Sequence, residues 1–173
     1  VFGRPLFDSA IIELPMGKKF VVETKNNEIT ASIQYAKKIQ MAILPPEELM
    51  REKLPEFGVF YEAKDIVSGD FYWMTDKEDS IYFAAVDCTG HGVPGAFMSM
   101  IGTSLLNQTM NEKGITKPSE ILDQVKAGII KSLNQGENKS SKDGMDAALC
   151  CFNKDTNILE FSGGNNPVYI VRK

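Results

Sequence analysis

The sequence predicts an α+β protein in which an antiparallel sheet packs against helices. Strand-like runs come first, two helical patterns follow, and more strand-like runs close the chain. Consecutive strands joined by short gaps pair antiparallel, whereas a parallel sheet requires strands and helices to alternate. With 173 residues, of which 43% are apolar and 24% charged, the chain is long enough for one main domain with a real core.

Residues 1–27 are predicted to form a separate N-terminal segment that contains a short β-hairpin. Two apolar runs, within 10–14 and 19–24, flank a turn in which Gly17 supplies the required conformation. Asn26 and Asn27 then break the pattern. The chain starts without methionine, which suggests an excised piece, and the sequence does not indicate the origin of this segment.

Residues 28–46 are predicted to form an amphipathic linker helix that Pro45 and Pro46 end. Two heptads are too few to establish a coiled coil, and a strict heptad would place the polar Gln40 on the seam. Two interpretations therefore stay open: the helix packs on the domain, or it is a dimeric or signal-transmitting linker. The apolar stripe consists of Ile29, Ile33, Ala36, Ile39 and Ile43.

Residues 47–173 carry the strands and helices of the main domain. Its two helical patterns span about 94–111 and 117–133, and a polar loop follows them. β-branched and aromatic residues mark the strands between turn residues. The predicted strands cover 57–63, 71–74, 81–86, 147–153, 158–163 and 167–172.

Composition excludes several classes of function. The net charge is −4 and there is no block of Lys or Arg, so neither a nucleic-acid partner nor an anionic membrane surface is indicated. No run approaches the roughly 18 apolar residues of a membrane span. Cys88, Cys150 and Cys151 lack metal-ligand spacing and are expected to be reduced core thiols, which favours a cytoplasmic location.

Two aspartates at the ends of a predicted hairpin are the first candidates for chemistry. Pairing about a turn centred between Glu78 and Asp79 sets Asp70 opposite Asp87. Opposed residues have Cβ atoms about 4.5 to 5.5 Å apart, and like charges there are unfavourable unless neutralised. A hard cation such as Mg²⁺ or Mn²⁺ would remove the conflict. The alternative is that both are turn or capping aspartates.

Residues 88–92 form a glycine-bracketed turn after the second of these strands. Gly90 and Gly92 would let a main-chain carbonyl reach an ion without side-chain obstruction. His91 is the only histidine, so a His-rich zinc site is excluded, and a turn or supporting role is expected for it. With Gly95 the glycines also fit GxGxxG, but no parallel strand follows the next helix, so dinucleotide binding is rejected.

A second acidic pair precedes a later strand. Asp143 and Asp146 could hold a metal, contact a substrate or form an Asx turn, and the pattern alone leaves all three open.

Together four motifs resemble the SpoIIE/RsbU-type branch of the metal-dependent PPM serine/threonine protein phosphatases. The similarity runs from about Ile29 to Lys173 and is carried by several motifs in order. They are VSGDFYW (67–73), VDCTGHGVPGAFMSMIG (86–102), DGMDAALC (143–150) and GGNNPVYIV (163–171).

The resemblance implies an α-β-β-α four-layer sandwich with two Mn²⁺ or Mg²⁺ ions in the complete domain. It implies that Asp70, Asp87 and the Cys88 main-chain carbonyl are metal ligands and that water activated by the ions attacks phosphorus. The family's further acidic ligands, after the NNP strand, have no counterpart here, so the fold and the ion site are expected to be incomplete. Residues around the site that could support it or contact substrate are Gly90, His91, Gly92, Asp143 and Asp146.

The function expected from the resemblance is a bacterial phosphatase of signal transduction. It would hydrolyse a phosphoserine or phosphothreonine on a regulatory protein, under an upstream sensor domain, and could form a homodimer through the linker helix. The alternative is a catalytically incomplete phosphatase-like module that acts in partner binding or dimerisation.

Overall fold

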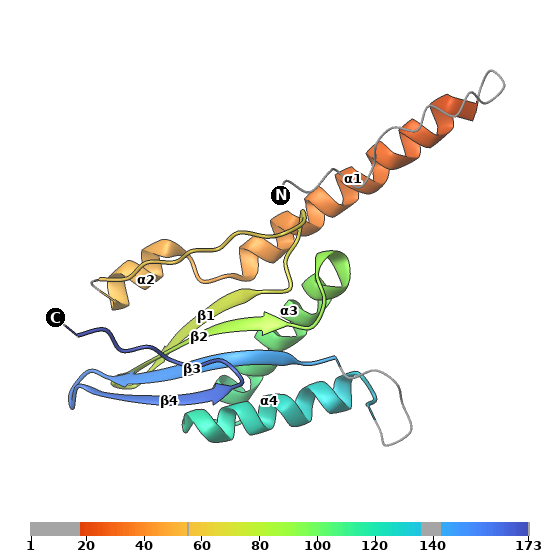
Figure 1. The fold of residues 1–173 in the computed structure, drawn as a ribbon. Coiled ribbons are helices and arrows are strands. Elements are labelled where there is room, and N and C mark those ends of the chain that lie inside the picture. The colour runs from red at the N-terminus through yellow and green to blue at the C-terminus, as the bar shows by residue number, and fades with distance from the viewer. Residues whose placement is uncertain (1–17, 55, 136–142, 173) are drawn as a thin grey trace.

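The protein is built around one antiparallel sheet, shown in Figure 1. The computed structural model describes residues 18–54, 56–135 and 143–172. Its strands follow one another across the sheet in the order β1-β2-β3-β4, which confirms the predicted α+β class. Of the two sheets expected, the described residues form one. The elements are α1 (Lys18–Ile43), α2 (Glu47–Lys53), β1 (Phe71–Lys77), β2 (Ser80–Cys88), α3 (Gly92–Asn107), the π-helical η1 (Gln108–Glu112), α4 (Pro118–Ser132), β3 (Met145–Asn153) and β4 (Ile158–Gly164).

Helices α3 and α4 cover one face of the sheet and form the main core with it (Figure 1). Alternate strand residues point toward these helices, as the twofold period of a strand requires. Leu149 on β3 is fully buried there with Leu106 of α3 and Ile121 of α4. The indole of Trp73 donates a hydrogen bond of 2.8 Å to Asn107, so the first strand is also fixed to the end of α3.

The opposite face of the sheet lies beneath α2 and the extended segment that follows it (Figure 1). Met50 of α2 packs with Met74 and Ile81 in a second, smaller core. Tyr61 meets Tyr72 edge to face, with ring centroids 5.7 Å apart. Both faces of β2 are therefore in contact with other parts of the chain, which explains its nearly continuous apolar sequence.

Helix α1 starts earlier than predicted. It begins at Lys18, so residues 19–24, expected as the second strand of a hairpin, are helical, and Asn26 and Asn27 lie inside the helix. The first expected strand and its turn lie outside the described residues. β-propensity is a weak preference, and a helix once nucleated gains one hydrogen bond for each added residue. The helix ends at Ile43, before the two prolines, as predicted.

The apolar stripe of α1 is largely uncovered by the described residues. Ile29 is 58% and Ile39 43% exposed, whereas Gln40 is buried. The helix projects from the body of the molecule and meets it near its C-terminal end (Figure 1). Simple packing of the whole stripe on the domain, one of the two predicted interpretations, therefore does not describe this helix.

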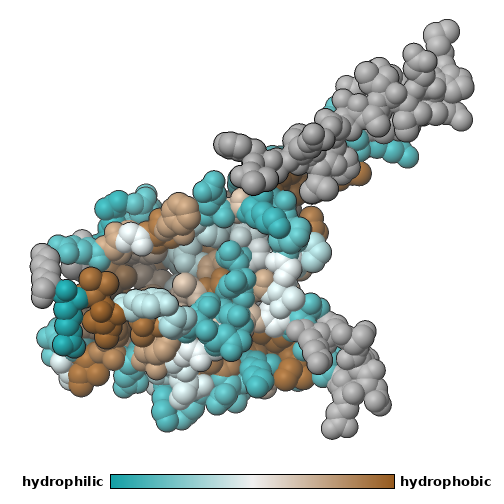
Figure 2. All heavy atoms as spheres, in the orientation of Figure 1, coloured by the Kyte–Doolittle hydropathy of each residue, from teal (hydrophilic) through white to brown (hydrophobic). Residues whose placement is uncertain are grey.

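Two predicted strands are extended but do not join the sheet. Residues 57–63 and 167–172 form no ladder with the described strands, although β1 and β4 are edge strands of the sheet. Strand-like composition reflects packing on a half-buried surface and does not by itself produce backbone pairing. Tyr169 and Val171 are 83% and 94% exposed. Figure 2 shows apolar surface gathered on the left side of the view, where this segment lies in Figure 1. Among the described helices, none is long and apolar enough to cross a bilayer.

Candidate metal centre

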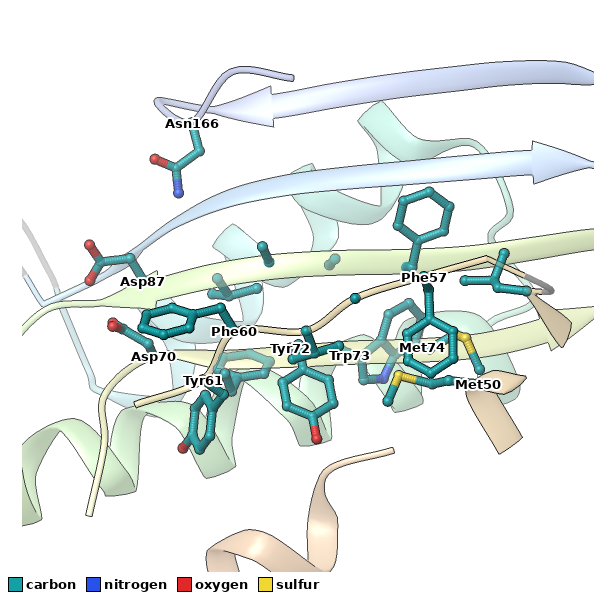
Figure 3. A pocket seen from close by; sticks show the side chains of 18 of the residues that line it. Met50, Phe57, Phe60, Tyr61, Asp70, Tyr72, Trp73, Met74, Asp87 and Asn166 are labelled. Carbon is teal, nitrogen blue, oxygen red and sulfur yellow. The ribbon is translucent and has the colours of Figure 1, made fainter. Parts of the chain in front are cut away.

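Asp70 and Asp87 lie side by side at one end of the β1–β2 hairpin (Figure 3). Phe71 pairs with Val86, and one further step of this register sets Asp70 opposite Asp87, which confirms the predicted pairing. Side-chain alternation puts both carboxylates on the face away from α3 and α4. The hairpin alone therefore brings these two acidic groups together.

The electrostatics of the pair reflect this closeness. The pKa of Asp70 is raised. The largest cause is partial desolvation, and the hydrogen bond to Asp87 and the negative charge of Asp87 add to it. Two neighbouring carboxylates resist full ionisation unless a proton or a cation lies between them. The pair thus offers oxygen atoms to a cation, and among the described residues neither carboxylate forms an ion pair.

The turn after Asp87 has the backbone conformation that its glycines predict. Gly90 and Gly92 have positive φ values of 91° and 60°, which residues with a Cβ atom rarely adopt. The Gly90 carbonyl also lies against two other glycines: a Cβ atom would come within 2.5 Å of it at Gly69 and 2.6 Å at Gly95. The main chain carrying Asp70 therefore packs directly on the turn that follows Asp87.

The same turn is hydrogen bonded to the segment before β3. Thr89 N donates to the Gly144 carbonyl at 2.9 Å, and Gly144 N donates to Thr89 Oγ1 at 3.0 Å. The register sets Asp146 opposite Asp87, yet its carboxylate accepts a hydrogen bond of 2.9 Å from Asn165. Asp143 accepts from Gln135 through its main-chain oxygen. The second acidic pair is thus adjacent to the turn.

The Cys88 side chain does not contribute a nucleophile. It is 3% exposed and faces the helix-covered core, and burial, with the charges of Asp70 and Asp87, raises its pKa to about 12. A thiol in this state stays protonated at neutral pH, so cysteine-based phosphoryl transfer is excluded at this position. Its carbonyl oxygen, in contrast, would lie 3.2 Å from a Cβ atom at Gly69, close to the loop of Asp70.

Two residues that the sequence did not single out for the site contact residues that lie around it. Asp65 Oδ2 lies 2.7 Å from His91 Nδ1. Gln40 of α1 hydrogen bonds to Ser68, two residues before Asp70. Neither stands in a motif of recognisable spacing, although the polar residue on the apolar seam of the helix was a signal for Gln40.

A cavity of about 630 Å³ runs along the same face of the sheet and ends at the two carboxylates (Figure 3). Its walls are mostly aromatic and aliphatic, with Phe60 and Tyr72 on one side. Asn166 faces it from beyond the end of β4. A smaller cleft of about 340 Å³ borders the carboxylates on the side of His91.

The donor set suits a hard divalent cation but is incomplete. Carboxylate and carbonyl oxygens are the ligands that Mg²⁺ and Mn²⁺ prefer. Within residues 18–54, 56–135 and 143–172, no three His, Cys, Asp or Glu side chains lie close enough together to hold an ion. In this part of the chain, Asp70 and Asp87 are therefore two oxygen donors without a third His, Cys, Asp or Glu side chain beside them.

Comparison with solved structures places this fold among PP2C phosphatase domains. The SiaA-PP2C domain of Pseudomonas aeruginosa matches with a TM-score of 0.70 and 31% identity, over 80% of this chain and 55% of that one. The chain belongs to the family described as Stage II sporulation protein E (SpoIIE), whose model matches residues 77–173. That match contains Asp87 and begins after Asp70.

A curated relative gives the same assignment. The phosphoserine phosphatase RsbU of Bacillus subtilis (strain 168) is 33% identical over 96 residues, which are 55% of this chain and 28% of that protein. The chain thus spans little more than a quarter of RsbU and about half of the SiaA domain. These matches confirm the predicted resemblance to SpoIIE/RsbU-type PPM phosphatases.

Proposed function

We propose that this chain forms part of a divalent-metal-dependent phosphatase that hydrolyses phosphoserine or phosphothreonine on a regulatory protein. The observation that supports it best is the pairing of Asp70 with Asp87 across the hairpin. Two carboxylates this close repel each other when both are charged, and a bound cation would compensate their charges. The phosphatase family, established by residues 77–173, supplies the reaction class.

In this proposal each residue has a role that depends on where it lies. Asp70 and Asp87, with the Cys88 carbonyl, would hold Mn²⁺ or Mg²⁺, two ions in a complete domain. When bound, such ions lower the pKa of water and offset charge on the phosphoryl group. Gly90 and Gly92 keep the turn free of side chains, and Asp143 and Asp146 lie on either side of Gly144, which is hydrogen bonded to Thr89 of the same turn.

The substrate and partners follow from the relatives and from α1. RsbU is named a phosphoserine phosphatase, which supports phosphoserine as the substrate group, and we propose that a regulatory protein in the cytoplasm carries it. The exposed residues Ile29, Tyr35 and Ile39 on α1 suit pairing with a second copy or docking of an upstream sensor domain. No nucleic acid or membrane contact is part of this proposal.

The test is manganese-dependent hydrolysis by the full-length protein that carries these residues. p-Nitrophenyl phosphate and a phosphoserine peptide would be assayed with Mn²⁺, with chelator and with Asp87→Asn. We expect chelation to remove the activity and Asp87→Asn to lower it about a hundredfold or more. Asp79→Asn, in the turn of the same hairpin, is the matched control and should keep full activity. Hydrolysis indifferent to chelator and to Asp87→Asn would overturn the metal mechanism.

A second candidate function is a phosphatase-like module that binds a partner without catalysis. It is favoured by the lack of a third metal-ligating side chain beside Asp70 and Asp87 in the described part of the chain. Isothermal titration with Mn²⁺ separates the two candidates. Tight binding lost in Asp70→Asn supports the enzyme, whereas absence of binding together with intact folding supports the module.

A further inference from the structure

We propose that Asp65 is a positioning residue of this phosphatase site and that it acts through His91. The inference rests on the proposed function. It begins with a short side-chain contact beside the carboxylate cleft, 2.7 Å between Asp65 Oδ2 and His91 Nδ1.

This contact fixes the orientation of the imidazole. A carboxylate accepts hydrogen bonds, so the hydrogen of this bond is on Nδ1 and Nε2 is left for another partner. His91 is the only histidine in the chain, and its ring borders the cleft that Asp70 and Asp87 also line. Nε2 is therefore the ring nitrogen that remains for a group entering the cleft.

The carboxylate of Asp65 also lies against the first residue of α3. A Cβ atom at position 92 would come 3.3 Å from Asp65 Oδ2, and Gly92 has a positive φ of 60°. A negative charge at a helix N-terminus is favourable because the first N–H groups of the helix are unpaired. One side chain thus contacts His91 and also lies near the start of the following helix.

Asp65 and His91 each lie close in sequence to one of the two carboxylates. Asp65 lies five residues before Asp70, whereas His91 lies four residues after Asp87. The pair consequently joins the segment before Asp70 to the turn that follows Asp87. The cleft between them also receives Lys64, its single lysine or arginine among the described lining residues.

Stability alone does not account for this arrangement. Both side chains are well exposed, 66% for His91 and 40% for Asp65, and exposed ion pairs contribute little to folding. A purely structural pair would therefore leave both stability and activity nearly unchanged when it is removed. A positioning pair would lower turnover while the melting temperature stays the same.

A double-mutant cycle on the full-length protein tests the inference. Asp65→Ala, His91→Ala and the double variant would be assayed with Mn²⁺ and a phosphoserine peptide, with thermal melts in parallel. We expect Asp65→Ala to lower kcat about tenfold, in the range seen for residues that orient an active group. His91→Ala should lower it at least as much, and the double variant should be no worse than His91→Ala.

Two further variants make the outcome specific. Asp65→Asn keeps an oxygen acceptor for Nδ1–H and should restore most of the activity lost in Asp65→Ala. Asp76→Ala, which removes the ion pair with Lys53 at the other end of β1, should leave kcat unchanged. A wild-type protein without manganese-dependent activity would overturn the proposed function and this inference with it. If the wild type is active, two results would overturn this inference but not the proposed function. One is that the losses of kcat in Asp65→Ala and His91→Ala multiply in the double variant, and the other is that Asp65→Ala keeps full kcat.

Discussion

Gln40 of α1 and Ser68 of the loop before β1 hold each other through two hydrogen bonds, and both residues are buried. Gln40 Nε2 donates to the Ser68 carbonyl at 2.6 Å, and Ser68 N donates to Gln40 Oε1 at 3.0 Å. The Gln40 amide also donates to Ser99 Oγ of α3 at 2.8 Å. Ser68 Oγ in turn accepts from Asp70 N at 3.1 Å. The end of α1 is therefore connected to the loop of a proposed metal ligand through a single side chain.

Replacing Gln40 should disturb both folding and the carboxylate pair. Gln40→Ala leaves the Ser68 N–H and carbonyl without partners, and a buried unsatisfied group costs about 1 to 3 kcal/mol. We expect the free energy of unfolding to fall by about that amount and the manganese affinity to weaken. Urea denaturation and calorimetric titration measure the two effects.

Gln34→Ala is the matched control for that experiment. Gln34 is on the same helix but exposed, so its removal should change neither stability nor metal affinity. Equal effects of the two substitutions would contradict the role given to Gln40.

The raised pKa of Asp70 predicts a pH-dependent cost in the metal-free protein. Because the folded-state pKa lies above the ordinary value of 3.8, the folded protein retains the proton longer than the unfolded chain. The stability that protonated Asp70 contributes is then fully present below pH 3.8 and is lost as the pH rises through the raised pKa. With chelator, Asp70→Asn should be more stable than wild type at pH 7, and the difference should vanish near pH 3.5.

Manganese should reverse this order at pH 7, because a cation compensates the charge of the wild-type pair. Chemical denaturation at both pH values, with and without Mn²⁺, measures it. A wild type that is more stable than Asp70→Asn at pH 7 in chelator would refute the account of the pair.

Gly69 should not tolerate a side chain. A Cβ atom there would lie 2.5 Å from the Gly90 carbonyl oxygen, a main-chain atom that cannot move aside cheaply. Gly69→Ala should therefore force the Asp70 loop away from the turn and lower metal affinity at least tenfold, on the order seen for disrupted metal-site support. Gly144→Ala is the matched control, because no atom of the described residues other than its chain neighbours lies within 4 Å of the added Cβ. Similar metal affinity in both variants would be inconsistent with the close crossing.

Leu149 is expected to be essential for the core between β3 and the helices. It is fully buried, so Leu149→Ala should lower the free energy of unfolding by about 2 to 5 kcal/mol. Leu159→Ala on β4, where the side chain is 44% exposed, should change it by less than about 0.5 kcal/mol. Equal losses, measured by urea denaturation, would mean that the helix-covered face is not the main core.

The hairpin register could be predicted because it depends on local information. A two-residue turn between Lys77 and Ser80 and an apolar run on each side leave little freedom in pairing. The glycines of the 88–92 turn were equally informative, since only their positive φ values make its path possible. These two local patterns are sufficient to bring Asp70 and Asp87 together.

The remaining interactions depend on contacts between distant segments. Asp65 meets His91 across 26 residues and Gln40 meets Ser68 across 28, and no sequence period relates such pairs. Residues 57–63 have strand composition but join none of the described strands, because such composition reflects packing on a half-buried surface rather than backbone pairing. The predicted start of helix α1 was wrong because the prediction placed a break at Asn26 and Asn27, although the helix continues through both residues.

The short turn at Glu78 and Asp79 also limits how this protein can change through insertion and deletion. Loops far from a catalytic centre usually accept length changes, because their effects remain local. Here one residue added to either strand would slip the ladder and reverse the faces of every later side chain on β2. Asp87 would then point into the helix-covered core, although it lies about 26 Å of strand from the turn at about 3.3 Å per residue. A change of chain length at the turn therefore alters the carboxylate pair at the other end of the hairpin.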